Sequence, residues 1–347
     1  MPNIIDFILL QGGKTFAEKP FCPVDAAVLS QLSYLKFEHI DNTETLLATL
    51  GAAGRERLFE DERFGEDQRR LYFEAAFSVR YQSMKVRDVQ SVKNDDSEVC
   101  FCAMVFEPEG CAPVVVFRGT DEFVVGWKED FAMAYRCPVP AQTLSVDYLA
   151  EAAAGRREFY VCGHSKGGNL AEYSVLHSGA ELRSRVKMVY DFDGPGFASS
   201  VLDMPEYTEM GGRIMKIVPR QSFVGQLLRS DAIGHRVDSD GAAIFQHDIF
   251  NWRVDSYGDF IYTDDESVGL STAIGRLNAN IAKLSADQLE RFVDALFAVL
   301  KDADIDNLVD FSKNWRHNSR RILSAYNDLD ETTKELLGDT VAELIFG

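Results

Sequence analysis

The chain has 347 residues, enough to bury a large core in one or two domains. Its formal charge of −19, from 55 acidic and 36 basic residues, would repel nucleic acid and anionic lipid headgroups, so we expect no nucleic-acid partner. The start around Asp6 lacks the basic region of a secretory signal, and no segment reaches the roughly 20 uninterrupted apolar residues that cross a bilayer, which predicts a soluble cytoplasmic protein without a transmembrane segment.

The first ninety residues are mostly helical in pattern. Apolar side chains recur at helical spacing over Pro23–Leu32 and Asp67–Ala76. The pattern then changes to the β-rich runs Val99–Phe106 and Val114–Phe117, with the turn signal Pro108-Glu109-Gly110 between them. These two runs predict a hairpin or two adjacent strands of a sheet.

Strands and helices then alternate. A helix is predicted around Leu144–Ala154, and strands are predicted at Phe159–Cys162, Val186–Phe192 and Arg213–Val218. This alternation favours an α/β fold with a largely parallel sheet covered by helices on both faces.

Two later segments have patterns of their own. Residues 219–246 mix glycine with large apolar side chains without a clean period, so they either cover the substrate or form an ordinary packed excursion. Beyond residue 265 the pattern is helical, and Ser285 with Gln288 predicts a capping-box start.

The cysteine spacing indicates neither a disulfide framework nor a metal site. There is no C-x-x-C pair and no nearby histidine cluster, and several cysteines interrupt apolar strand runs. We expect buried thiols in a reducing compartment, with no metal and no organic cofactor. The cysteines are Cys22, Cys100, Cys102, Cys111, Cys137 and Cys162.

Residues 163–167 read G-x-S-x-G, directly after the predicted strand and before a helical pattern. A serine on such a turn adopts strained dihedrals that expose its hydroxyl, and the helix N-terminus faces developing negative charge. Gly163 and Gly167 would let the neighbouring backbones pass closely. A glycine-rich loop is the alternative, but the flanking patterns favour a nucleophile elbow with Ser165 as the nucleophile.

Such a serine needs a general base and an acid that orients it, and both follow the elbow in α/β-hydrolases, the acid first. Among the later histidines, His177 lies about three turns along the elbow helix and is too distant, and His317 falls in the helical tail. His247 follows irregular glycine-rich sequence, as a histidine on a loop would. We predict His247 as the base, with His235 in reserve.

The predicted acid is Asp193, where a strand runs straight into Gly194-Pro195 at the carboxyl edge of the sheet. Its alternative role is to bond the amides of its own turn. Asp191 shares its strand parity but lies deeper, and Asp248 should point away from the adjacent histidine. Asp238 and Asp240 stay open as candidates.

An oxyanion hole needs two backbone N–H groups. One is predicted from Lys166, the residue after the nucleophile. The second is predicted from Thr120, after the strand Val114–Phe117, where Gly119 permits a close approach and the Thr120 hydroxyl can add a donor.

These motifs resemble a known group. Phe117-Arg118-Gly119-Thr120, with Trp127 and Asp130-Phe131 after it, and the elbow Gly163–Ala171 are similar to the class 3 lipases among α/β-hydrolases. The chain more closely resembles a largely uncharacterised bacterial branch with the elbow H-S-K-G-G-N-L-A and the motif Q-H-D, here Gln246-His247-Asp248. That resemblance spans most of the chain, including Pro20–Asp25.

We expect an α/β-hydrolase catalytic domain over residues 1–264, N-terminal helices included, and a packed helical C-terminal extension over residues 265–347. We expect a serine hydrolase that cleaves a carboxylic ester through an acyl-enzyme. The resemblance favours a lipid or another acyl ester, and thioesters and amides stay open as substrates. The rival hypothesis is an inactive hydrolase fold kept as a binding or scaffolding module, which the complete set of serine, histidine and carboxylate argues against.

Two departures from the class 3 pattern matter. Those lipases have a hydrophobic residue where Lys166 stands, and we expect the lysine side chain to face solvent. They also carry the acid after the strand that corresponds to Ile214–Val218, whereas residues 219–225 contain no carboxylate. Pancreatic-type lipases place the acid one strand earlier, in a sequence resembling Phe192-Asp193-Gly194-Pro195, which supports Asp193.

Overall fold

The computed structural model describes most of the chain up to residue 264 and scattered residues beyond it. The described residues are 2–40, 45–51, 57–60, 65–94, 99–120, 132–133, 136–222, 224–230, 233–241, 243–264, 275, 278–279, 285, 287–288, 290–291 and 294. Trp127, Asp130, Phe131, His317 and nearly all of the expected C-terminal extension lie outside them.

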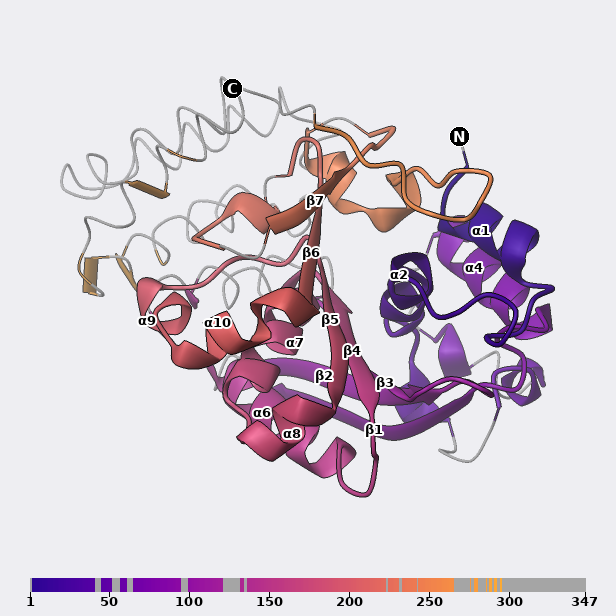
Figure 1. Ribbon diagram of the computed structural model, residues 1–347, viewed down its shortest axis with the longest axis horizontal. Helices are drawn as coiled ribbons and strands as arrows, with labels where there is room; N and C mark the ends of the chain where they lie inside the picture. The colour runs from indigo at the N-terminus through magenta and orange to yellow at the C-terminus, as the bar shows by residue number, and fades with distance from the viewer. Residues whose placement is uncertain are drawn as a thin grey trace.

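Within the described residues the core is a mixed sheet of seven strands that lie side by side in chain order (Figure 1). The first three strands pair antiparallel, and the third to the seventh pair parallel, which confirms the α/β prediction. The strands are β1 (Lys85–Asn94), β2 (Val99–Glu107), β3 (Val114–Phe117), β4 (Phe159–His164), β5 (Val186–Phe192), β6 (Ile214–Pro219) and β7 (Ile233–Val237).

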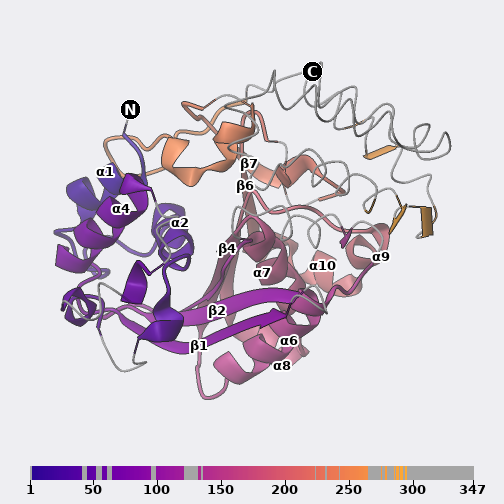
Figure 2. The ribbon, with the colours of Figure 1, turned by 180° about the vertical axis from the view of Figure 1, so that it is seen from behind.

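Helices cover both faces of this sheet, as Figures 1 and 2 show from opposite sides. Each crossover from β3 onward moves one strand in the same direction, and crossovers of one hand place their helices on one face. That face carries α6 (Pro140–Ala152), α7 (Lys166–Leu176), α8 (Ala180–Arg185), α9 (Ser199–Leu202) and α10 (Pro205–Met210). The opposite face is left to α1 (Ile4–Gln11), α2 (Pro23–Leu32) and α4 (Glu66–Phe77).

The side chains of the central strands alternate between these two layers. Val114 and Val116 of β3 pack into the core that contains α1, α2 and α4, whereas Val115 and Phe117 pack into the core that contains α6 and α7. Because both faces are buried, the strand is continuously apolar, which made it easy to predict.

Short 3₁₀ segments connect several of these elements. They are η1 (Phe37–His39), η2 (Ala48–Leu50), η3 (Gly211–Arg213), η4 (Val224–Gln226), η5 (Ala243–His247) and η6 (Ile249–Asn251). The last two carry the predicted base and the residues after it.

The two edge strands were not predicted. β1 has largely exposed, charged positions and a register shift between Arg87 and Gln90, so it lacks a strand pattern. β7 lies inside residues 219–246 and pairs with β6. That part of the segment is therefore a strand of the sheet, and the interpretation of the whole segment as a substrate cover is wrong for residues 233–237.

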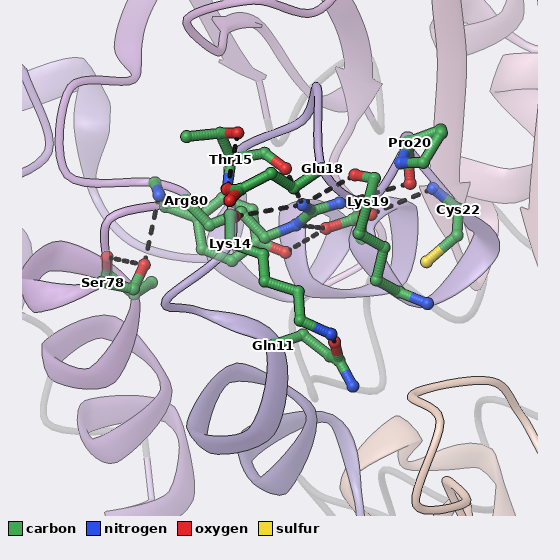
Figure 3. A network of polar contacts seen from close by, with 12 residues as sticks. Gln11, Lys14, Thr15, Glu18, Lys19, Pro20, Cys22, Ser78 and Arg80 are labelled. Carbon is green, nitrogen blue, oxygen red and sulfur yellow. Dashed lines mark hydrogen bonds and ion pairs between the residues drawn. The ribbon is translucent and has the colours of Figure 1, made fainter.

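A network of polar contacts around Arg80 fixes the N-terminal layer (Figure 3). Arg80 donates from Nε to Oδ1 of Asp25 over 2.6 Å, and both side chains are fully buried. The same guanidinium donates to the carbonyl of Lys19 over 2.9 Å and lies over the ring of Phe16. Tyr81 donates its hydroxyl to Asp25. The network ties the segment between α1 and α2 to the end of α4.

Three further expectations from the sequence can be compared with the structure. All six cysteines are free thiols, but only Cys102 and Cys162 are buried, and Cys137 is exposed, so the expectation of burial holds only in part. In the part of the chain that the structure describes, no helix combines the length and apolar character of a membrane span.

Ser285 and Gln288 exchange side-chain-to-backbone hydrogen bonds of 3.3 and 2.9 Å, which confirms the predicted capping box.

Candidate active site

Ser165 stands between β4 and α7 in a strained backbone conformation. Its φ of 58° lies in the left-handed region that side chains rarely adopt. A Cβ atom on Gly167 would lie 2.1 Å from the carbonyl oxygen of Phe117, and one on Gly163 would lie 2.2 Å from Gly167. The predicted strand, elbow and helix are therefore present, and both glycines are required by close backbone contacts.

The expected exposure of the Ser165 hydroxyl is wrong in degree, because the residue is only 4% exposed. The end of the β3 segment crosses over the elbow. A Cβ atom on Gly119 would lie 3.2 Å from Cβ of Ser165 and 2.2 Å from the hydroxyl of Tyr34. The Gly119 backbone thus packs closely against the serine, and the Tyr34 hydroxyl packs against Gly119.

His247 and Asp193 meet at the carboxyl edge of the sheet. Nδ1 of His247 lies 2.7 Å from Oδ2 of Asp193, which is fully buried, while the His247 side chain is 15% exposed. Asp193 has a φ of 55°, so it too adopts the left-handed conformation. Its amide donates to the carbonyl of Ile217 on β6 over 2.9 Å. The turn after β5 therefore directs this carboxylate toward the histidine.

The other carboxylate oxygen of Asp193 has donors from the loop after β6. Ser222 donates its hydroxyl to Oδ1, and the amide of Gly225 donates to the same oxygen over 3.2 Å. Residues 219–225, which carry no acid of their own, thus support the acid of the preceding strand. Burial raises the pKa of Asp193, and the hydrogen bonds from His247 and Ser222 oppose that shift.

This pairing assigns the histidine tautomer. An ionised carboxylate only accepts, so Nδ1 of His247 carries the proton and Nε2 of the neutral ring is the proton acceptor. A histidine oriented in this way can act as a general base.

The loop that carries His247 is held through its neighbours. Gln246 is buried and accepts the amide of Gln221 on its side-chain oxygen over 2.8 Å. Its backbone carbonyl accepts the indole N–H of Trp252 over 2.7 Å. Asp248 is exposed and caps the next turn through the amide of Phe250, so it points away from the histidine, as expected.

His164, the residue before Ser165, also fixes the loop that carries His247, and the sequence did not suggest this role. Its Nε2 lies 2.8 Å from the carbonyl oxygen of His247, and its Nδ1 lies 2.9 Å from the hydroxyl of Tyr34. A carbonyl only accepts, so Nε2 carries the proton and Nδ1 accepts from Tyr34. Burial, reinforced by the nearby His247, holds the pKa of His164 well below its ordinary 6.5, which keeps this ring neutral.

Arg118 in turn positions Tyr34. Its Nε donates to the carbonyl of Ser33 over 2.5 Å, and Nη2 donates to the carbonyl of Leu35 over 2.6 Å. Glu38 pairs with the same guanidinium at 2.8 Å. The strand end beside the elbow therefore clamps the backbone on both sides of Tyr34, and the N-terminal layer becomes part of the site.

The alternative candidates lie elsewhere. His235 is on β7 with its ring 4.8 Å from that of Tyr262, and His177 stacks on Tyr173 at 3.8 Å. Asp191, not Asp193, accepts the amide of its own turn, from Gly194 over 2.8 Å. Asp238 and Asp240 both pair with Arg253.

The predicted oxyanion donors follow the strand ends that meet at the elbow. Lys166 begins α7, and Thr120 follows Gly119, whose Cβ position lies only 2.5 Å from the carbonyl oxygen of His164. The expectation for the Lys166 side chain is wrong, because it is buried and Nζ donates to the carbonyl of Cys100 on β2 over 2.8 Å. The described residues contain no group of three or more metal-binding side chains.

A mixed, largely parallel sheet, a strained serine at a strand-to-helix turn and a histidine–carboxylate pair from later loops define an α/β-hydrolase fold. Residues 75–298 match the Mbeg1-like family, so the chain belongs to this lipase-like family. The prediction of a lipase-like group is confirmed at that level, and the particular bacterial branch stays a prediction.

Among solved structures, this chain is similar to the protein in the crystal structure of M37 lipase. The two chains are 13% identical with a TM-score of 0.38, and the match covers 92% of this chain and 96% of the other. The search of the curated proteins finds no match to this chain.

Proposed function

We propose that the protein is a serine hydrolase that cleaves a carboxylic ester. Ser165 is the nucleophile, His247 the general base and Asp193 the residue that orients it. The observation that carries this proposal is the 2.7 Å contact between His247 and Asp193 at the sheet edge where Ser165 occupies a strained elbow.

The reaction follows from these assignments. Oγ of Ser165 attacks the carbonyl carbon while Nε2 of His247 takes its proton, and the backbone N–H groups of Thr120 and Lys166 stabilise the resulting oxyanion. The tetrahedral intermediate collapses, and His247 returns the proton to the departing alcohol. Water, activated by the same histidine, then attacks the acyl-enzyme and releases the acid.

The substrate class proposed is a lipid-like or other acyl ester. Membership of a lipase-like family supports it. The six free thiols fit a reducing compartment, and we propose a cytoplasmic enzyme on that ground.

Labelling with a fluorophosphonate tests the proposal, because this reagent phosphonylates an activated serine. We expect the wild type to be labelled and the Ser165→Ala variant not to be. A panel of esters that differ in acyl length and head charge then defines the substrate. Absence of both labelling and ester cleavage would instead favour a binding or scaffolding module.

A further inference from the structure

Three ionisable side chains that the proposed reaction does not use are fully buried beneath the elbow. Glu172 comes from α7, Asp191 from β5 and Lys216 from β6. Nζ of Lys216 lies 3.0 Å from Oδ2 of Asp191. Burying such charges is costly unless they are paired and hydrogen-bonded, so their contacts indicate what they do.

The Asp191 carboxylate lies between the elbow helix and the turn that carries Asp193. Its Oδ1 accepts the amide of Gly194 over 2.8 Å. A Cβ atom on Gly168, the third residue after the nucleophile, would lie 1.8 Å from the same oxygen. The absence of a side chain at Gly168 is therefore what lets this carboxylate reach the turn.

Lys216 binds the carbonyl group of Gly194, the residue whose amide Asp191 accepts. Its Nζ donates to the carbonyl oxygen of Gly194 over 2.5 Å, in addition to pairing with Asp191. Both backbone polar groups of Gly194 are thus fixed by one buried ion pair. Gly194 directly follows Asp193, whose left-handed backbone must be held in place by its surroundings.

Glu172 completes the charge balance of this cluster. Burial, followed by the nearby Asp191, holds the pKa of Glu172 well above its ordinary value, and Lys216 opposes the shift only in part. This shift favours the protonated form of Glu172, and Lys216 and Asp191 form the ion pair of the cluster. A neutral carboxylic acid can donate its proton toward Asp191.

We propose that Lys216 is a positioning residue which, together with Asp191, fixes Gly194 and so aligns the Asp193 carboxylate with His247. This inference rests on the proposed function. A purely structural ion pair is the competing explanation, since removing one partner of any buried pair destabilises a fold.

A pair of variants separates the two explanations. Lys216→Met leaves Asp191 buried without its cation, whereas Asp191→Asn with Lys216→Met removes both charges. We expect the double variant to recover the melting temperature lost in Lys216→Met but to keep a kcat reduced by about 10²-fold, the order of loss caused by misaligned groups, with KM nearly unchanged. Recovery of both melting temperature and kcat in the double variant would overturn the inference.

Two matched controls define the baseline. Lys187→Met removes a lysine from β5 that is largely solvent-facing and pairs with Glu158, and we expect kcat to stay at the wild-type value. Glu172→Gln keeps a neutral donor beside Asp191, and we also expect wild-type kcat. A large fall in kcat for Glu172→Gln would contradict the charge balance assigned to the cluster.

The proposed function and the positioning role can fail separately. Fluorophosphonate labelling of the wild type decides the function. The hydrogen bond between His247 and Asp193 is followed without any substrate through the downfield imidazole N–H proton resonance, identified by its loss in His247→Ala. We expect this resonance to shift or broaden in the double variant. An unchanged resonance would overturn the positioning role even if the protein hydrolyses no ester.

Discussion

Replacing Asp193 by asparagine removes one buried charge and puts an amide group where Oδ2 faces His247. The asparagine oxygen can still accept from Ser222 and Gly225, so the NH₂ group turns toward Nδ1 across the present 2.7 Å contact. Two facing donors are incompatible, and the imidazole must move its proton to Nε2. That nitrogen can then no longer accept the proton of Ser165.

The expected loss has two parts. A hydrogen bond to a charged group contributes roughly 1.5–3 kcal/mol, a factor of about 10 to 10² in rate. The wrong tautomer accounts for the remainder of an expected fall of about 10⁴ in kcat, comparable to the loss known for the same substitution in serine proteases. Since burial raises the pKa of Asp193, removing its charge should leave the melting temperature unchanged or higher.

The assay is steady-state hydrolysis of a short acyl ester, with thermal unfolding measured on the same samples. Asp203→Asn, at an exposed position next to α9, is the control and should behave as the wild type. If Asp193→Asn retains kcat within about tenfold of the wild type, the tautomer argument fails and another acid must be sought.

Three further predictions use the same assays. The pKa of Glu172 in the folded protein lies above its ordinary 4.5, so its contribution to stability is complete below pH 4.5 and is lost as the pH rises toward the folded pKa. Over that pH range the melting temperature of Glu172→Gln should rise relative to that of the wild type. A difference in melting temperature that does not change with pH would refute this prediction. His164→Leu removes the N–H group that donates to the carbonyl of His247 and should lower kcat about 10-fold or more. His164→Gln keeps a side-chain N–H donor and should retain most of the wild-type kcat. An equal loss of kcat in both variants would refute the role of the donor. Gly168→Ala, whose Cβ atom would lie 1.8 Å from Oδ1 of Asp191, should fail to fold or lose activity. Gly179→Ala, whose Cβ atom meets nothing within 4 Å, should be neutral. A fully active Gly168→Ala variant would contradict the close packing of Gly168 on Asp191.

The parallel core could be predicted because its strands are buried on both faces. The continuous apolar run Val114–Phe117 and the mostly apolar run Val186–Phe192 are bounded by turn signals, and the observed β3 and β5 have these same limits. The edge strands β1 and β7 were not predicted. Each has a partner strand on one side only, so its sequence mixes charged and apolar residues and lacks a continuous apolar run.

The candidate site divides in a similar way. The serine, histidine and acid could be nominated because chain order and local turns restrict them, and the structure brings Asp193 and His247 into contact. Tyr34 and Ser222 carry no local signal, since their contacts arise only when distant segments pack. Lys166 was misjudged because helix position alone does not reveal the strand carbonyl that its side chain reaches.

The clamp of Arg118 on the residues around Tyr34 has a practical consequence for anyone who trims this chain. The family match begins at residue 75, downstream of α1, α2 and Tyr34. A fragment cut at that boundary would leave Val114 and Val116 uncovered and His164 without its hydroxyl partner. A fragment limited to the family match would thus lack a layer that both closes the hydrophobic interior and contacts the candidate active site, so expression trials should begin at the first helix.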